Sequence, residues 1–282
     1  MNYCDAHNHL QDDRLDGHLD DLLTTCARAG IARMVVNGTC EADWPQLLAL
    51  ARHAASAEDP AVPARGIQII PSFGYHPWYL ARRTPEWLEH LEHYLTEIPS
   101  AVGEIGLDRW KPDLPYAGQE AAFVAQLRLA ADRNLPVSIH CLQAWGRLLE
   151  LLRSHPRPER GFLLHSFGGP AELIPALARL GAYFSFPGYF LHARKERQRE
   201  TFKAVPSDRL LIETDAPDQS LPPENIRYPL TGRDGKPLNH PANLEAVYAG
   251  LAKYLGEDLN TLAAKVENNF QRVFAEGHLL KN

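Results

Sequence analysis

The sequence has few cysteines and no long apolar run. Its 282 residues include only four cysteines, and no two of them form a CxxC pair, so we expect reduced, packed thiols and no disulfide scaffold. No apolar run approaches the roughly 20 residues that a membrane-spanning helix needs, and the first residues have neither a basic leader nor an apolar signal core. We therefore expect a cytoplasmic protein that makes no contact with a membrane.

An excess of positive charge is also absent. The formal net charge is −6 at pH 7, so binding to a nucleic acid requires local cations or metal ions to offset repulsion. This charge argues against stable coating of a duplex. Hydrophobic residues make up 45% and charged residues 23%, a mixture typical of a soluble chain with a sizeable core. No obligate protein partner is evident.

Short apolar segments recur along the chain and alternate with segments of helical spacing. They lie at residues 2–7, 33–38, 68–75, 101–106, 137–140, 161–165, 182–186 and 210–214. Continuous apolar strands are typical of a parallel sheet covered on both faces, and a barrel of eight strand–helix units takes about 250 residues. We predict a single (β/α)8 TIM barrel over residues 1–282, with a long proline-rich substrate loop at 216–241 and amphipathic helices at 243–255 and 259–274.

Metal-binding side chains end several of these segments. They are His7, His9, Glu104, His140, His165 and Asp215. A barrel gathers the C-terminal ends of its strands around one mouth, so positions far apart in the sequence become one cluster. The pattern predicts a two-metal hydrolase, with Mg²⁺, Mn²⁺ or Zn²⁺ as candidate ions because mixed histidine and carboxylate sets accept each of them.

The first of these segments ends in Asp5-Ala6-His7-Asn8-His9. Alternation along an extended backbone puts Asp5, His7 and His9 on one side, so two imidazoles reach one ion. We interpret Asp5 as a residue that orients a ligand histidine rather than as a ligand. The alternative is a surface turn with incidental histidines.

Two carboxylates have candidate catalytic roles. Glu104 lies in an apolar strand, where an unpaired charge is costly, and its two oxygens suit a bridge between two ions. Asp215 can hold one ion and accept the proton of a metal-activated water. The alternatives are a structural ion pair between Glu104 and Arg109, and a turn cap by Asp215 next to Pro217.

The third segment ends in Gly74-Tyr75-His76-Pro77-Trp78, which supplies candidate substrate contacts. His76 suits a phosphate or other anionic group beside the metals, and Tyr75 or Trp78 suits stacking on a base or sugar. Aromatic packing under a rigid X-Pro turn is the alternative.

Taken in order, these motifs resemble the TatD family of metal-dependent hydrolases, within the amidohydrolase-like barrels. The matching segments also include Gly103-Glu104-Ile105-Gly106-Leu107-Asp108, Leu164-His165-Ser166-Phe167 and Glu213-Thr214-Asp215-Ala216-Pro217. The resemblance implies that His7, His9 and Asp215 hold one ion, that His140 and His165 hold the other, and that Glu104 bridges them. It also implies a deoxyribonuclease that removes nucleotides from the 3′ ends of single-stranded DNA, or acts on a small phosphodiester.

One departure affects the substrate. Many members of that family have an arginine shortly after the fifth-strand histidine, whereas this chain reads His140-Cys141-Leu142. A missing guanidinium removes a bidentate phosphate contact. Arg227, Arg233 and Lys236 in the long loop are candidates to compensate. Leu142 and Trp145 are equally compatible with a less anionic substrate.

Three functional hypotheses follow. The first is phosphodiester hydrolysis on single-stranded DNA ends. The second is hydrolysis of an amide, ester or lactone by the same ions, because metal-activated water also attacks carbonyl carbon. The third is a catalytically idle barrel that serves as a binding module with a structural metal, against which the complete ligand set argues.

Overall fold

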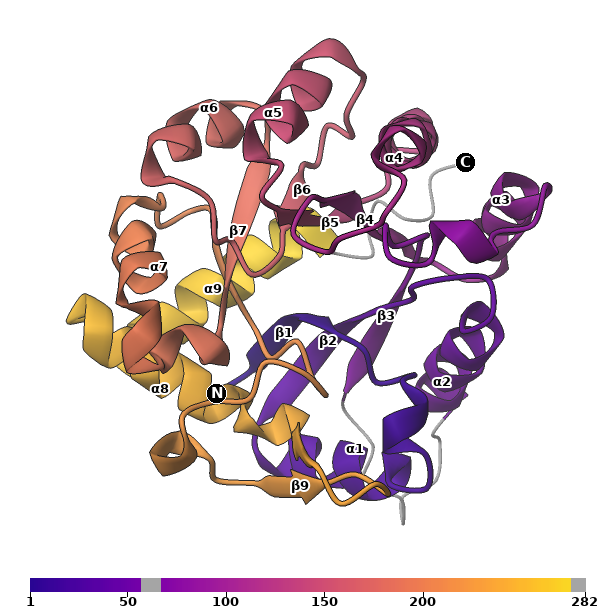
Figure 1. The fold of residues 1–282 in the computed structure, drawn as a ribbon. Helices are drawn as coiled ribbons and strands as arrows, with labels where there is room; N and C mark the ends of the chain where they lie inside the picture. Colours follow the sequence, from indigo (N-terminus) through magenta and orange to yellow (C-terminus); the bar gives the residue numbers. More distant parts are fainter. Residues whose placement is uncertain (57–66, 275–282) are drawn as a thin grey trace.

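A computed structural model describes residues 1–56 and 67–274. Eight parallel strands form one sheet in sequence order, and the helices surround them (Figure 1). The strands are β1 (Tyr3–Asn8), β2 (Ile31–Asn37), β3 (Gln68–Phe73), β4 (Ala101–Asp108), β5 (Val137–Leu142), β6 (Phe162–Leu164), β7 (Ala182–Pro187) and β8 (Leu210–Glu213). This order confirms the predicted TIM barrel. That one domain spans all of residues 1–282 stays a prediction.

The α-helices follow the strands in the expected alternation. They are α1 (Leu19–Arg28), α2 (Trp44–Ser56), α3 (Trp87–Glu97), α4 (Tyr116–Asp132), α5 (Trp145–Ser154), α6 (Ile174–Arg179), α7 (Glu196–Thr201), α8 (Leu244–Leu255) and α9 (Leu259–Phe274). Both C-terminal helices pack against β8 and β1, as expected for the outer layer of the barrel. Within the described ranges, no helix has the length and apolar character needed to cross a membrane.

The barrel is closed between its first and last strands by bonds near their C-terminal ends. The Asp215 N–H donates to the His7 carbonyl at 3.0 Å, and the His9 N–H donates to the Ala216 carbonyl at 2.7 Å. Thr214 donates from its N–H (2.9 Å) and its hydroxyl (2.6 Å) to the buried Asp5 carboxylate. The closure therefore joins two segments that carry predicted metal ligands.

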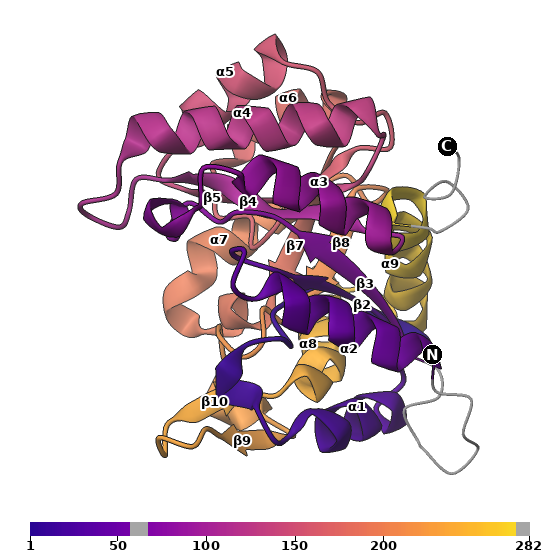
Figure 2. The same cartoon turned by 90° about the vertical axis from the view of Figure 1, so that its right-hand side faces the viewer.

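The predicted substrate loop at 216–241 has secondary structure of its own. It contains an antiparallel hairpin of β9 (Pro229–Thr231) and β10 (Pro237–Asn239), which lies on the side of the barrel away from the N-terminus (Figure 2). Strands this short lack the alternating pattern by which a hairpin is detected. The Asn239 amide donates to the Thr214 carbonyl at 2.9 Å, so the hairpin is tied to the end of β8.

Strands β4 and β5 approach each other closely at Gly106. A Cβ atom at this position would lie 2.0 Å from the His140 carbonyl oxygen and 2.8 Å from its carbonyl carbon. Backbone atoms of a central strand cannot move aside without displacing the strand itself. Only glycine therefore allows β5 to carry His140 at this distance from β4.

A Gly106→Ala substitution is expected to lower the free energy of unfolding by about 1–3 kcal/mol or more, because overpacking against backbone cannot relax locally. Urea unfolding measures the change. Gly118→Ala is the matched control, because a Cβ at Gly118 in α4 meets no atom within 4 Å, and alanine raises helix stability by about 0.5–1 kcal/mol. Equal stability of the two variants would contradict the close approach.

Candidate metal centre

The six predicted metal ligands come together at the C-terminal end of the barrel. His7 belongs to β1, Glu104 to β4 and His140 to β5, while His9 and His165 directly follow β1 and β6, and Asp215 is the second residue after β8. Five of the six side chains are buried, and that of His9 is 14% exposed. The structure therefore brings every predicted ligand into one cluster.

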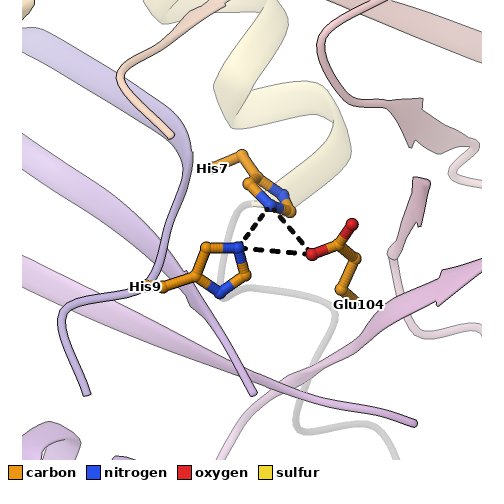
Figure 3. Close-up of side chains that lie close together, drawn as sticks. All are labelled: His7, His9 and Glu104. Carbon is orange, nitrogen blue, oxygen red and sulfur yellow. Dashed lines mark hydrogen bonds and ion pairs between the residues drawn. The ribbon is translucent and has the colours of Figure 1, made fainter. Parts of the chain in front are cut away.

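Glu104 lies at the middle of this cluster. Its Oε2 is 3.4 Å from Nε2 of His7 and 3.3 Å from Nε2 of His9, as drawn in Figure 3. Its Oε1 is 3.0 Å from Nδ1 of His140 and 2.9 Å from Nε2 of His165. His76 Nε2 also lies 3.3 Å from Oε1. The two oxygens thus face separate sets of imidazoles, which is the arrangement that a bridging carboxylate requires.

Asp215 lies on the side of the first histidine pair. Its Oδ1 is 3.6 Å from His7 Nε2 and 3.5 Å from His9 Nε2. The backbone of Asp215 has φ +53°, a left-handed conformation that Asp and Asn adopt more readily than most residues. Gln219 donates to its Oδ2, which holds the carboxylate toward the histidines.

The spacing of these atoms fits divalent metal ions. Zn–N bonds are about 2.0–2.1 Å, so ligand atoms that share an ion lie about 3–4 Å apart. Three groups have ligand atoms that all lie within 4.8 Å of one another: His7, His9 and Glu104; His7, His165 and Asp215; and His76, Glu104 and His140. The buried Glu104 Oε1 makes no hydrogen bond with any described residue, as expected of an oxygen that faces a cation.

The charge balance at Glu104 supports the same conclusion. Burial raises the pKa of a carboxylic acid, but the surrounding imidazoles of His76, His165 and His7 outweigh burial and hold the pKa of Glu104 well below its usual range. Burial lowers the pKa of His9, whereas its contacts with Asp215 and Glu104 raise that pKa well above the ordinary value. The carboxylates thus require positive charge nearby, which protons or metal ions can supply.

Residues that the sequence analysis did not single out hold the ligand imidazoles. The Nδ1–H of His9 donates to the Asn37 carbonyl at 2.7 Å, and His7 Nδ1 lies 2.8 Å from the Ser138 hydroxyl. The Nε2–H of His140 donates to Asp108 at 2.9 Å. These bonds leave the opposite ring nitrogen free to bind a metal.

A signal for two of these partners is present in the sequence. Asp108 lies four residues after Glu104 in β4, and Ser138 lies two residues before His140 in β5. Side chains at even spacing share one face of a strand, so both residues face the side of the strand that carries the metal ligand. The Asn37 carbonyl has no such signal because any residue can supply a backbone oxygen.

Asp5 lies beneath the centre, but its contacts differ from those expected. Its carboxylate accepts from the backbone N–H of His7 at 3.4 Å and from Thr214, and makes no bond to a ligand imidazole among the described residues. Burial raises the pKa of Asp5 to about 7. It therefore positions His7 through the backbone at the β1–β8 junction, whereas Ser138 contacts the ring.

A cavity of about 730 Å³ opens over the metal centre. His76 and Trp78 line it, as expected of substrate contacts. His76 Nδ1 accepts the Trp78 N–H at 3.1 Å, so its Nε2 carries the proton and acts as a donor rather than as a metal ligand. Burial lowers the pKa of His76 to about 4, which keeps this imidazole neutral near pH 7.

The structure does not bring Tyr75 to the cavity. Its ring is buried, with edge contacts to Trp44 and Trp87 at centroid distances of 6.0 and 5.8 Å. Successive side chains of an extended segment point to opposite sides, so Tyr75 and His76 cannot both face the substrate. For Tyr75, aromatic packing is therefore the correct interpretation.

The arginines and lysine considered in the sequence analysis are engaged elsewhere. Arg109 lies over the Tyr116 ring at 3.9 Å and does not pair with Glu104. Among the loop cations, Arg227 pairs with Glu245, Arg233 donates to the Asp16 carbonyl, and Lys236 pairs with Asp234. None of the three is among the residues that line the cavity, so they do not replace the missing arginine.

An Asp108→Asn substitution is expected to weaken metal binding about 10- to 100-fold, the usual effect of losing a partner of a ligand histidine. The Asp108 carboxylate accepts from His140, Trp78, Trp110 and Lys111, and an amide must turn one N–H toward these donors. Calorimetric titration of the metal-free protein measures the affinity. Asp13→Asn, which removes an exposed acid from the same cavity, is the control and should change affinity less than about twofold. Equal losses of metal affinity in both variants would show that the total charge of the cavity, and not the contacts of Asp108, determines the effect.

Comparison with known proteins identifies the family of this chain. The model of the family TatD related DNase matches residues 4–275. The chain is 32% identical over 261 residues to the 3′-5′ ssDNA/RNA exonuclease TatD of Escherichia coli K12, covering 90% of this chain and 92% of the relative. It is 28% identical to the uncharacterized metal-dependent hydrolase YjjV of the same organism, covering 96% and 97%.

Solved structures share the same barrel. The crystal structure of the TatD homologue YjjV from Escherichia coli K12 has a TM-score of 0.83 at 27% identity, over 97% of this chain and 98% of that one. A TatD family hydrolase from Entamoeba histolytica has a TM-score of 0.81 at 19% identity, over 98% and 99%, and shows the fold alone. The match of the family model and the identity to these relatives confirm the resemblance seen in the motifs: the chain belongs to the TatD related DNase family.

Proposed function

We propose that the chain is a divalent-metal-dependent deoxyribonuclease that removes nucleotides from the 3′ ends of single-stranded DNA. The observation that carries the proposal is the position of Glu104, whose two oxygens face separate imidazole pairs. Two ions, of Mg²⁺, Mn²⁺ or Zn²⁺, would then share this carboxylate. One ion would have His7, His9 and Asp215 as its ligands, and the other would have His140 and His165. The relative named 3′-5′ ssDNA/RNA exonuclease TatD supports this choice of substrate.

The residues of the chain have distinct roles in this proposal. Bound divalent ions supply Lewis acidity and lower the pKa of a water molecule. The Asp215 carboxylate accepts the proton of the attacking water, and Gln219 holds that carboxylate in place. The Nε2–H of His76, 3.3 Å from Glu104 Oε1, donates to an oxygen of the phosphate. These fixed donors and acceptors orient the phosphodiester for attack.

The cavity charge favours the end of a strand over a long polyanion. Its lining contains six acids, Asp12, Asp13, Asp43, Glu104, Asp215 and Asp218, and the cations Arg14 and Arg82. Arg14 is already paired with Asp12 and Asp218 at 2.8 and 2.7 Å. Few cations thus remain for phosphates other than the one at the metal centre. A cavity of about 730 Å³ has the size of a site for a small ligand, which suits one terminal nucleotide.

Hydrolysis of an amide, ester or lactone is the second candidate. The observation that favours it is Leu142, the last residue of β5, which lines the cavity where an arginine would contact phosphate and is 36% exposed. The same metal centre can activate water toward a carbonyl carbon. A panel of small esters, lactones and amides, assayed beside oligonucleotides, separates the two candidates.

The nuclease proposal predicts a ladder of products shortened from the 3′ end when a 5′-labelled single strand is incubated with Mg²⁺, Mn²⁺ or Zn²⁺. Glu104→Gln is expected to lower kcat at least about 100-fold, because an amide has one oxygen and no charge with which to hold two ions. Glu120→Gln, which changes an acid paired with Arg147 outside the cavity, is the control and should retain activity. Absence of nucleotide release with every metal, together with turnover of a carbonyl substrate, would favour the second candidate.

A weak dependence on salt is also expected. Each phosphate neutralised by the protein contributes about −0.7 to the slope of log affinity against log salt concentration for single strands, and the cavity offers about one or two available cations. The slope of log kcat/KM, measured with saturating metal between low and moderate salt, should therefore be no steeper than about −1.5. A slope steeper than about −3 would reveal a cationic strand-binding surface that this cavity does not contain.

A further inference from the structure

Two of the most exposed large hydrophobic side chains lie at the rim of the metal cavity. Among the described residues, the exposed large hydrophobics are Met1, Trp110 and Leu142. Trp110 is 59% exposed, and it lines the cavity together with Leu142. Neither residue has a role in holding the metals. An apolar surface kept in water at the mouth of a site is typical of a ligand contact.

The backbone that carries Trp110 is held in place. The N–H groups of Trp110 and Lys111 donate to Asp108 Oδ1 at 2.7 and 2.9 Å, and the Arg109 N–H donates to the Leu142 carbonyl at 2.9 Å. This turn lies in the loop between β4 and α4, which projects beyond the strand ends in Figure 2. The indole is thus exposed on a structured turn rather than on an unsupported loop.

The same carboxylate connects this turn to the metal centre. Asp108 Oδ2 accepts from His140 Nε2 at 2.9 Å and from Trp78 Nε1 at 2.6 Å. The backbone of Trp110 is therefore linked to the predicted metal ligand His140 by two hydrogen bonds through one side chain. Because the backbone is held, only the side-chain torsions of Trp110 must be ordered when a ligand stacks on the indole.

The chemistry of the rim selects a planar, uncharged group. Lys111 Nζ lies 4.3 Å from the centroid of the Trp78 ring, so a cation occupies one face of that indole, whereas the Trp110 side chain has no ring or cation partner among the described residues. Leu142 adds an apolar surface where a guanidinium would bind phosphate. Nucleobases have flat π-faces that stack on aromatic side chains with little regard to sequence.

We propose that Trp110, assisted by Leu142, stacks on a nucleobase next to the scissile phosphate, and that this contact replaces cationic recognition of the strand. The inference rests on the proposed nuclease function. It assigns strand binding to a π-face at the rim and hydrolysis to the metal centre. The identity of the base should then have little effect on KM, whereas removal of the base should raise KM strongly.

The test compares Trp110→Leu, which keeps apolar bulk without a π-face, with Trp110→Phe, which keeps a ring. The substrates are a single strand and the same strand with abasic sites at its last two 3′ positions. On the normal strand, Trp110→Leu should raise KM about tenfold with kcat nearly unchanged, and Trp110→Phe should raise it about twofold. On the abasic strand, wild type and both variants should have similar, high KM values, because the stacking partner is gone. Melting temperatures should match wild type, since Trp110 is largely exposed.

Binding of both strands is also measured by fluorescence anisotropy, which does not require cleavage. Equal KM values and equal affinities for wild type and Trp110→Leu on the normal strand would overturn the proposal that Trp110 stacks on a base, while leaving the nuclease function intact. Binding that depends on Trp110 and on the bases, without cleavage in the presence of any metal, would overturn the nuclease function but support stacking of a base on Trp110. Absence of both binding and cleavage would overturn both.

Discussion

The position of the Glu104 carboxylate between two pairs of imidazoles is the constraint on which the rest of the site depends. A buried carboxylate is costly without compensating positive charge, and the imidazoles hold the pKa of Glu104 well below its usual range although burial opposes them. Protons on the histidines or metal ions at the same place can supply the compensation, so metal binding is coupled to proton release. The cluster is therefore assembled for a cation, and the surrounding strands must hold its atoms at ligand distances.

The barrel meets this requirement through its closure and its close packing. The bonds between the ends of β1 and β8 join the backbone of His7 to that of Asp215. The contacts that close the barrel therefore also bring together two residues that could hold the same ion. Gly106 allows β4 and β5 to approach until a Cβ would meet the His140 carbonyl. On each side of Glu104, the distance between ligands thus depends on backbone contacts, which vary less than side-chain rotamers. A site of this kind tolerates changes in the loops better than changes in the strands.

The sequence allowed prediction of what depends on periodicity. Eight apolar runs and the ligands at their ends were sufficient to predict the barrel and the cluster, because parallel strands end on one side.

Features that depend on particular contacts could not be predicted in this way. Asp108 accepts the Nε2–H of His140, so Nδ1 is the nitrogen of His140 that can face a metal. The even spacing of Asp108 from Glu104 indicates this contact only once the strand is known to extend to Asp108. Alternation would also have separated Tyr75 from His76. The pairing of Arg227, Arg233 and Lys236 outside the cavity has no sequence signal, since it depends on where the hairpin folds.

Asp108 links the two halves of the proposed function. Its four acceptor contacts hold the imidazole of His140, the indole of Trp78 and the turn that carries Trp110. A carboxylate can accept all four because it has only lone pairs to offer, and an amide cannot. Acidic side chains outnumber cationic ones around the cavity. Most of the positive charge that a phosphodiester meets here therefore belongs to the metal centre. Recognition away from the scissile phosphate must then come from uncharged surface. An acid-rich cavity with an indole at its rim therefore favours a strand end that enters base first over a backbone that is bound along its length.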